Sequence, residues 1–247
     1  MACSSLPDWY LRRRIAVIDL GSATWRQARS EVVPPGYTPN ECMRRLVRAK
    51  RVRRVGRGLF VIVDPARETP AIATASALFA ELPHYVTTDA ALAHHGLIDQ
   101  PILRITVVLA RSRRPIDIGP ALVCPVTISA DRLAVADAYQ TTSDGFEVRL
   151  ATREQAVVDA LAEPAWMVHG DLLAEVLAAF TAEELQRTAT GAMARSTAAA
   201  QRLGYLLEDA GGPLPQALAE VRPVRAVRLQ PGRKGKGPYS TRWRVYG

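Results

Sequence analysis

Hydrophobic residues near the N-terminus recur at the spacing of a helix. Three of them lie three or four positions apart: Leu11, Ile15 and Ile18. This spacing predicts a first helix over residues 9–20. A second, shorter helix is expected over residues 24–31, and the Pro-Pro-Gly sequence at 34–36 predicts a turn after it. Two helices and a turn are therefore expected before the next element.

The third predicted helix has the clearest start in the chain. Thr38 is a favourable N-cap, Pro39 fits the first turn, and Glu41 completes a capping box. The helical period then divides the side chains between two faces. The buried face is expected to hold Cys42, Met43, Leu46 and Val47, and the solvent face Asn40, Arg44, Arg45 and Arg48.

After Arg51 the pattern changes from helical to alternating. Hydrophobic residues between positions 52 and 63 predict two short strands, joined by a tight glycine turn at residues 55–58. Three helices followed by a hairpin with a basic tip is the order of a winged helix-turn-helix. In that arrangement the third helix enters the major groove of DNA, and the hairpin lies along the phosphate backbone. We therefore predict such a domain over residues 1–65.

The rest of the chain, residues 66–247, mixes helical and strand patterns. Helices are expected over residues 69–82, 170–180, 182–190 and 196–210, with a short helix capped by a threonine and closed by Gly96, and another that begins with a Thr152–Gln155 capping box. Strands are expected over residues 102–109, 122–128, 146–150, 224–229 and 240–246. The predicted fold class is α/β (α+β), with the winged helix-turn-helix followed by a larger mixed α/β domain.

Composition restricts the class of protein. With 247 residues, 48% of them hydrophobic and 23% charged, the chain has the composition of a globular protein. It contains no apolar run long enough for a membrane helix, and Asp19 interrupts the run that could have formed an export signal. Its three cysteines are far apart, with no metal-ligand spacing. We expect a cytoplasmic protein without a structural zinc site or a membrane partner.

Charge is distributed unevenly along the chain. Residues 1–60 carry a net charge of +9, residues 61–220 a net charge of −9, and residues 221–247 a net charge of +8. A basic head and tail on an acidic body predict that one end binds nucleic acid while the body has another role.

The densest basic cluster lies on the third helix and the hairpin. Eight basic residues and no acidic one occur between positions 44 and 57. Arginine can bond guanine through two donors, asparagine can pair with adenine, and basic side chains of a hairpin suit phosphates. A solvated basic face is the alternative. The candidate DNA-binding residues are Thr38, Asn40, Arg44, Arg45, Arg48, Lys50, Arg51, Arg53, Arg54 and Arg57.

The body offers little catalytic chemistry. The adjacent His94 and His95 point in different directions on a helix, so a structural role is favoured over a shared metal. The sequence Glu147-Val148-Arg149 weakly resembles a nuclease motif but fits strand alternation better, and Cys124 is expected in the core. No phosphate-binding loop, dinucleotide fingerprint or nucleophile elbow is present. We predict neither an enzyme nor a bound metal or cofactor.

Three stretches, in this order and spacing, resemble AbiEi-type antitoxins, the transcriptional regulators of bacterial abortive-infection (type IV) toxin–antitoxin systems. They are residues 44–61; residues 85–97 with Gln100-Pro101 after them; and residues 148–161, followed later by residues 201–208. The resemblance spans most of residues 40–210. The loop at 233–237, rich in arginine, lysine and glycine, is not a feature of that family.

The resemblance implies a repressor that binds operator DNA of its own operon through the N-terminal domain. It assigns base and phosphate contacts to Arg44, Arg45, Arg48, Arg53, Arg54 and Arg57. It also implies that the C-terminal domain counteracts a nucleotidyltransferase-like toxin, with no residue assigned to that role. The alternatives are a stand-alone winged-helix regulator whose body senses a ligand or dimerises, a nuclease, and an RNA-binding protein.

Overall fold

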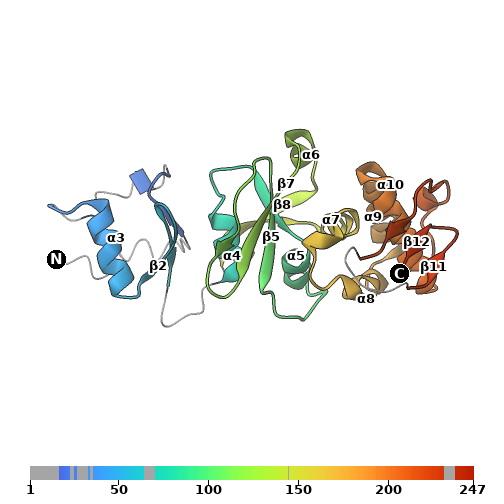
Figure 1. Cartoon of the computed structure of the whole chain (residues 1–247), viewed down its shortest axis with the longest axis horizontal. Coiled ribbons are helices and arrows are strands. Elements are labelled where there is room, and N and C mark those ends of the chain that lie inside the picture. The colour runs from blue at the N-terminus through green and yellow to red at the C-terminus, as the bar shows by residue number, and fades with distance from the viewer. Residues whose placement is uncertain are drawn as a thin grey trace. The chain divides into compact units, whose positions relative to one another are not determined.

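A computed structural model describes residues 17–22, 25–26, 33, 36–63, 70–143, 145–230 and 237–247 (Figure 1). It confirms the predicted α+β class, because helices alternate with strands that form separate sheets. The chain divides into two compact units. One comprises residues 1–86, 103–135 and 140–149, and the other residues 87–102, 136–139 and 150–247. The domain boundary expected after residue 65 lies inside the first unit.

The N-terminal region contains a three-stranded antiparallel sheet. Its order is β1 (Val17–Asp19), β3 (Leu59–Ile62) and β2 (Val52–Gly56), with α3 (Pro39–Arg48) between β1 and β2 in the chain. The prediction of a helix over residues 9–20 is wrong for residues 17–19, which form the strand β1. Strand pairing far along the chain, Val17 with Val61, overrides the helical spacing.

Other parts of the two first predicted helices lie outside the described residues. Residues 9–16, 24 and 27–31 belong to this group, whereas residues 25–26 are helical. Helix α3 packs on one face of the sheet and forms a small hydrophobic core with it. The buried members of this core are Ile18, Trp25, Cys42, Met43, Leu46, Val52, Phe60 and Ile62.

A six-stranded sheet follows, in the order β6-β7-β5-β4-β9-β8. Its strands are β4 (His84–Thr87), β5 (Arg104–Leu109), β6 (Ile116–Asp117), β7 (Leu122–Thr127), β8 (Ala138–Ser143) and β9 (Phe146–Ala151). The strands expected over 102–109, 122–128 and 146–150 are confirmed as β5, β7 and β9. The sequence does not predict the other three strands, because β4 has four buried residues without alternation, β6 is only two residues long, and β8 is a polar edge strand.

Short helices accompany this sheet: α4 (Ala71–Ala77), α5 (Asp89–His94) and α6 (Ala130–Ala134). Gly96 closes α5 with a φ of 70°, as expected. The threonine before α5 does not cap it, because the Thr88 side chain makes no bond to the helix. Its hydroxyl instead donates to the carbonyl oxygen of Trp166 at 3.3 Å.

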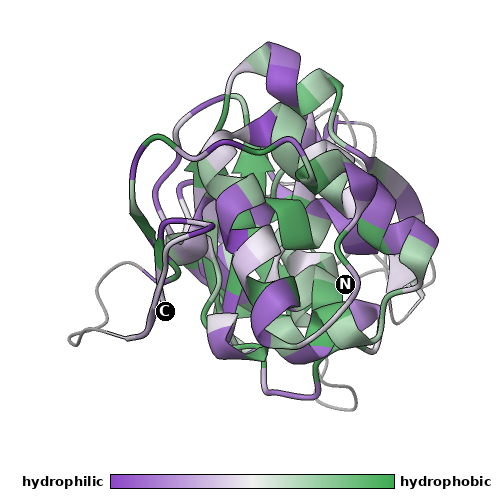
Figure 2. Cartoon of the chain, turned by 90° about the vertical axis from the view of Figure 1, so that its right-hand side faces the viewer, coloured by the Kyte–Doolittle hydropathy of each residue, from purple (hydrophilic) through white to green (hydrophobic). Residues whose placement is uncertain are grey.

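Four helices dominate the C-terminal part of the chain: α7 (Arg153–Ala162), α8 (Leu173–Ala178), α9 (Ala182–Arg195) and α10 (Thr197–Asp209). Short 3-10 turns lie at Pro164–Trp166, Gly170–Leu172 and Gln216–Leu218. Helix α9 packs against α7 and α10. The helices that face the viewer in Figure 2 carry both hydrophobic and hydrophilic residues, as expected where one side of a helix is buried. Within the described ranges, no helix combines the length and apolar character needed to cross a bilayer.

A small sheet ends the chain. Its order is β10 (Val227–Arg228), β12 (Val245–Tyr246) and β11 (Tyr239–Ser240), and it packs on α10. The strand expected over 224–229 is confirmed in shorter form as β10. The single strand expected over 240–246 is wrong, because residues 241–244 form a turn and β11 and β12 on either side of it pair with each other. The Trp243 ring lies so close to α10 that a Cβ at Gly204 would come within 2.4 Å of it. Glycine at position 204 therefore permits this packing.

Candidate nucleic-acid interface

Helix α3 begins as the sequence predicts. The Thr38 side chain accepts a hydrogen bond from the Glu41 amide at 3.3 Å, and the Glu41 carboxylate accepts from the Thr38 amide at 2.7 Å. The bond from the Thr38 amide above all, with a second from the Thr38 hydroxyl to the same carboxylate at 2.8 Å, lowers the pKa of Glu41 below its ordinary value. Thr38 and Glu41 are therefore both engaged in the cap that begins the helix.

The two faces of α3 differ sharply in exposure. Cys42, Met43 and Leu46 are buried against the sheet. The four expected polar residues are exposed: Asn40, Arg44, Arg45 and Arg48. The prediction that Val47 is buried is wrong, since 38% of it is exposed. It lies three positions after Arg44 and seven after Asn40, so these three share one side of the helix.

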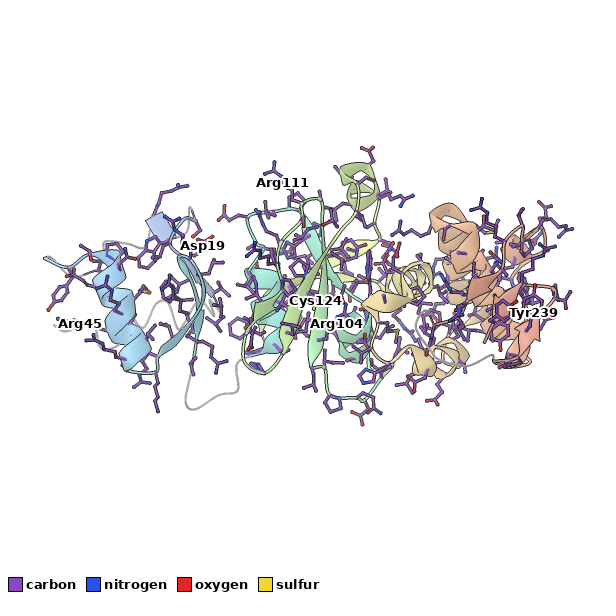
Figure 3. The ribbon with its side chains drawn as sticks, in the orientation of Figure 1. Asp19, Arg45, Arg104, Arg111, Cys124 and Tyr239 are labelled. Atoms are coloured by element: carbon purple, nitrogen blue, oxygen red, sulfur yellow. The ribbon has the colours of Figure 1, made fainter. Side chains whose placement is uncertain are left out.

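Arg45 stands at the flank of this exposed side. Its guanidinium carbon lies 4.5 Å from the centre of the Tyr37 ring, within the range of a cation–π interaction. Figure 3 labels Arg45 on α3. Sequence reasoning missed both Tyr37 and Val47, since neither is polar enough to stand out in a basic segment.

The end of α3 places two further cations. Lys50 has a left-handed backbone with a φ of 55°, and its amide donates to the Val47 carbonyl at 3.0 Å. The Arg51 amide donates to the Leu46 carbonyl at 2.9 Å. These two bonds form a Schellman motif, in which glycine is the usual left-handed residue. Lys50 and Arg51 are both exposed at this end of the helix.

The β2–β3 hairpin has the expected tight turn. Gly58 has a φ of 75°, and its carbonyl accepts from the Leu20 amide at 2.9 Å, which ties the turn to the segment after β1. Arg57 is exposed at the tip, and the Arg54 side chain donates to the Gly56 carbonyl at 3.2 Å. The hairpin therefore carries exposed cations at and beside its turn.

Arg53 differs from the other candidate residues in its position. It pairs with Val61 across the strands, and Val61 pairs with Val17. Neighbouring strand residues alternate between faces, and Val52, Phe60 and Ile62 occupy the face that packs on α3. Arg53 is thus on the opposite face of the sheet from α3. The structure brings the other candidates together on α3, its C-terminal end and the hairpin turn.

The charge of this region is uncompensated. Residues 36–63 contain eight basic residues and one acidic residue, Glu41. Within the part of the chain that the structure describes, none of the eight forms an ion pair. Like charges at this density repel each other, and a polyanion would relieve the repulsion.

The other residues considered from the sequence have structural surroundings. The His95 ring bonds the Ala151 carbonyl at 3.0 Å through Nε2, and Cys124 is a buried free thiol. Glu147 and Arg149 are exposed on β9 while Val148 is buried, which is strand alternation. Among the described residues, no group of three or more His, Cys, Asp or Glu side chains could hold a metal ion.

Comparisons with known proteins add a fold relationship. No protein-family model matches the chain, and no curated protein matches it. Among solved structures, the chain is similar to the RV2827C protein from Mycobacterium tuberculosis, with 19% sequence identity and a TM-score of 0.63. The alignment covers 98% of this chain and 92% of that one. At this identity the similarity is one of fold.

Proposed function

We propose that residues 1–65 form a winged helix-turn-helix that binds double-stranded DNA, with α3 in the major groove and the β2–β3 hairpin on the backbone. The order of the described elements supports this assignment. A strand precedes α3, a hairpin follows it, and the three strands pair as β1-β3-β2. A capping box at one end of α3 and a Schellman motif at the other stabilise the helix backbone, so its exposed side chains extend from a well-defined backbone.

The exposed side of α3 carries the proposal. Its residues provide three ways to recognise a base edge: an amide at Asn40 for adenine, a guanidinium at Arg44 for guanine, and methyl groups at Val47 for thymine. Cations at Lys50, Arg51 and Arg57 suit phosphates that flank the groove. Arg53, on the other face of the sheet, has a weaker case as a contact.

We further propose that the protein is a cytoplasmic repressor of its own operon and the antitoxin of a type IV toxin–antitoxin system. Its partners would be operator DNA and a nucleotidyltransferase-like toxin. The likeness to AbiEi-type antitoxins supports this half. Two of the stretches that carry the likeness contact each other: the Thr87 hydroxyl donates to the Asp159 carboxylate at 2.8 Å, and His95 bonds Ala151. These hydrogen bonds link the two stretches to each other within the C-terminal part of the chain.

The DNA-binding half is tested by titrating the purified protein with its own upstream DNA and with scrambled DNA, using fluorescence anisotropy. We expect preference for the upstream sequence and, for about six phosphate contacts, a slope of about −5 in log K against log salt between about 50 and 200 mM. A variant with Arg44, Arg45 and Arg48 all changed to Ala should lose the preference.

The matched control changes Arg111, Arg113 and Arg114 to Ala. These three are exposed arginines of the loop between β5 and β6, so the control removes the same charge from another site. It should retain the preference for the upstream sequence. Equal losses in the two triple variants would mean that total charge, and not α3, determines binding.

The antitoxin half is tested by co-expression with the neighbouring gene, if that gene encodes a nucleotidyltransferase-like protein. Growth arrest by that protein alone, relieved by this chain, would support the antitoxin role. Relief that survives the triple α3 variant would place neutralisation outside the DNA-binding surface. A neighbour that is harmless on its own would favour the stand-alone regulator.

A further inference from the structure

The small C-terminal sheet has one buried face and one exposed face. Val245, fully buried, faces α10, and Val227 is its register partner on β10. The Gln201 side-chain amide of α10 donates to the carbonyls of Arg225 and Trp243 at 2.9 and 2.7 Å. These contacts fix the sheet on the helix, so its other face is a rigid surface of unit 2.

That other face carries a row of three side chains. Arg228 on β10 pairs in register with Tyr246 on β12, and Tyr246 pairs with Tyr239 on β11. Register partners project from the same face of a sheet. Tyr239 and Tyr246 are 45% and 41% exposed, and their ring centres are 4.7 Å apart with the planes tilted by 38°. Figure 3 labels Tyr239 on this sheet.

The surroundings of this aromatic row are basic. The described residues 221–230 and 237–247 carry five basic residues and no acidic one. Arg225, Arg228 and Arg244 are exposed within the described part of this segment. The nearby carboxylate of Glu208 is already engaged, because it accepts from Arg242 at 2.9 Å and from the Trp243 indole. An exposed pair of aromatic rings in a positive field fits an anionic ligand that has flat, unpaired rings.

We propose that the Arg228–Tyr246–Tyr239 row is a stacking platform for the unpaired bases of a single-stranded nucleic acid. Bases of a strand can stack on exposed tyrosine rings, and arginine adds a charge to the backbone and a flat guanidinium to the base. Paired bases of a duplex are already stacked on each other and do not offer their faces. The platform is separate from the α3 surface and does not depend on the function proposed for it.

The test uses the full-length protein and fluorescein-labelled oligouridylate and oligodeoxyuridylate of about 12 nucleotides, within the site sizes of sheet-based single-strand binders. Changing Tyr239 and Tyr246 together to Ala should weaken binding of the single strands about tenfold or more, because stacking is lost at two positions. Changing both to Phe keeps the rings and should leave the affinity within about threefold.

Two controls distinguish binding by the platform from binding through charge in general and from binding by the α3 surface. Tyr139→Ala removes a tyrosine of similar exposure (39%) on β8 and should not change single-strand binding. The Tyr239/Tyr246 double Ala variant should bind duplex upstream DNA as the wild type does. Retained single-strand affinity in that double variant, or an equal loss in Tyr139→Ala, would overturn the platform.

The two probes then identify the sugar chemistry. Equal affinity for the RNA and DNA strands is expected if the rings contact bases alone, whereas a preference for RNA adds a contact to the 2′-hydroxyl. A duplex of the same length could instead bind as tightly as the single strands, with neither affinity changed by the tyrosine substitutions. That result would mean that the protein contacts only the charged backbone, and it would contradict the proposal.

Discussion

Arginine has two different roles in the two ends of this molecule. Around α3 and the β2–β3 hairpin, the cations are exposed and none of them forms an ion pair within the described residues. In the C-terminal part of the chain, several arginines form ion pairs, among them Arg153 with Glu184 at 2.6 Å, Arg187 with Glu154 at 2.7 Å, and Arg242 with Glu208 at 2.9 Å. The number of arginines therefore says less about function than whether each one is satisfied within its own chain.

The comparison implies that stability and nucleic-acid affinity can be separated by mutation. Removing a satisfied arginine should destabilise the fold, since its partners lose hydrogen bonds. Removing an exposed arginine from α3 should leave stability unchanged and weaken binding.

The largest effect is expected at Arg202, which is buried on α10. Its guanidinium donates to the carbonyls of Leu161 at 2.6 Å and Arg228 at 2.8 Å, and burial lowers its pKa. Arg202→Ala should cost about 3 kcal/mol, because buried carbonyls lose charged donors and the aliphatic stem no longer packs. We expect a melting temperature lower by about 6–12 °C for a chain of this length. Differential scanning fluorimetry measures this shift.

The matched control is Arg111→Ala, which removes an exposed arginine and should leave the melting temperature unchanged. Duplex affinity of Arg202→Ala, measured well below its melting temperature, should equal that of the wild type. A stable Arg202→Ala protein with lost DNA binding would contradict the division of roles between the two ends.

Local signals made some of this contrast predictable from the sequence. The capping box at Thr38, the helical period of α3 and the glycine turn near Gly58 depend on residues a few positions apart, and the structure contains all three. The prediction that Val47 is buried is wrong because the helical period alone does not show where the covered side of α3 ends. Val47 is 38% exposed.

Features that depend on distant pairing could not be read from the sequence. Residues 17–19 are a strand because Val17 pairs with Val61, more than forty positions later. The tyrosine row depends on the register of three two-residue strands, which no local period reveals. Arg53 carries the same charge as Arg54, and only the pairing with Val61 shows that it faces away from α3.

The second effect is expected at Arg44, in the middle of the exposed side of α3. Arg44→Ala should cost about 1–3 kcal/mol of affinity for the upstream sequence and less for scrambled DNA, if its guanidinium bonds a base. Arg57→Ala should instead weaken binding equally on both DNAs and reduce the salt slope by about one unit, as a phosphate contact does. Anisotropy titrations at two salt concentrations distinguish these patterns. Identical behaviour of the two variants would refute base recognition by Arg44.

The third prediction concerns pH and the buried His84. Its Nε2 lies 2.9 Å from the Ser76 hydroxyl, its Nδ1 lies 2.8 Å from the Leu82 carbonyl, and the same hydroxyl accepts from the Arg149 amide at 3.2 Å. Burial, reinforced by the charge of Arg149, lowers the pKa of His84 below its ordinary value of 6.5. The fold therefore favours the neutral ring.

The sign of the pH effect follows from this lowered pKa. The stability contribution is complete above pH 6.5 and is lost as the pH falls below it, because the unfolded chain then binds a proton that the folded chain resists. Urea unfolding at about pH 7.5 and about pH 5 should show a decrease that is smaller in His84→Gln. An unchanged pH dependence in His84→Gln would exclude His84 as its source.

The smallest effect is expected at Lys50, a residue that we expect to affect both the stability of α3 and the affinity for DNA. Its left-handed backbone, with a φ of 55°, is one that glycine adopts without strain. Lys50→Gly should stabilise the end of α3 by about 0.5–1 kcal/mol and still weaken duplex binding, since a phosphate contact is lost. Lys50→Ala removes the same charge but keeps the strained backbone, so it should weaken binding equally without the gain in stability. Hydrogen exchange of the α3 amides measures the local stability, and anisotropy measures the affinity. If glycine and alanine gave the same exchange rates, the left-handed backbone at Lys50 would carry no strain; if both kept wild-type affinity, this cation would not be part of the interface.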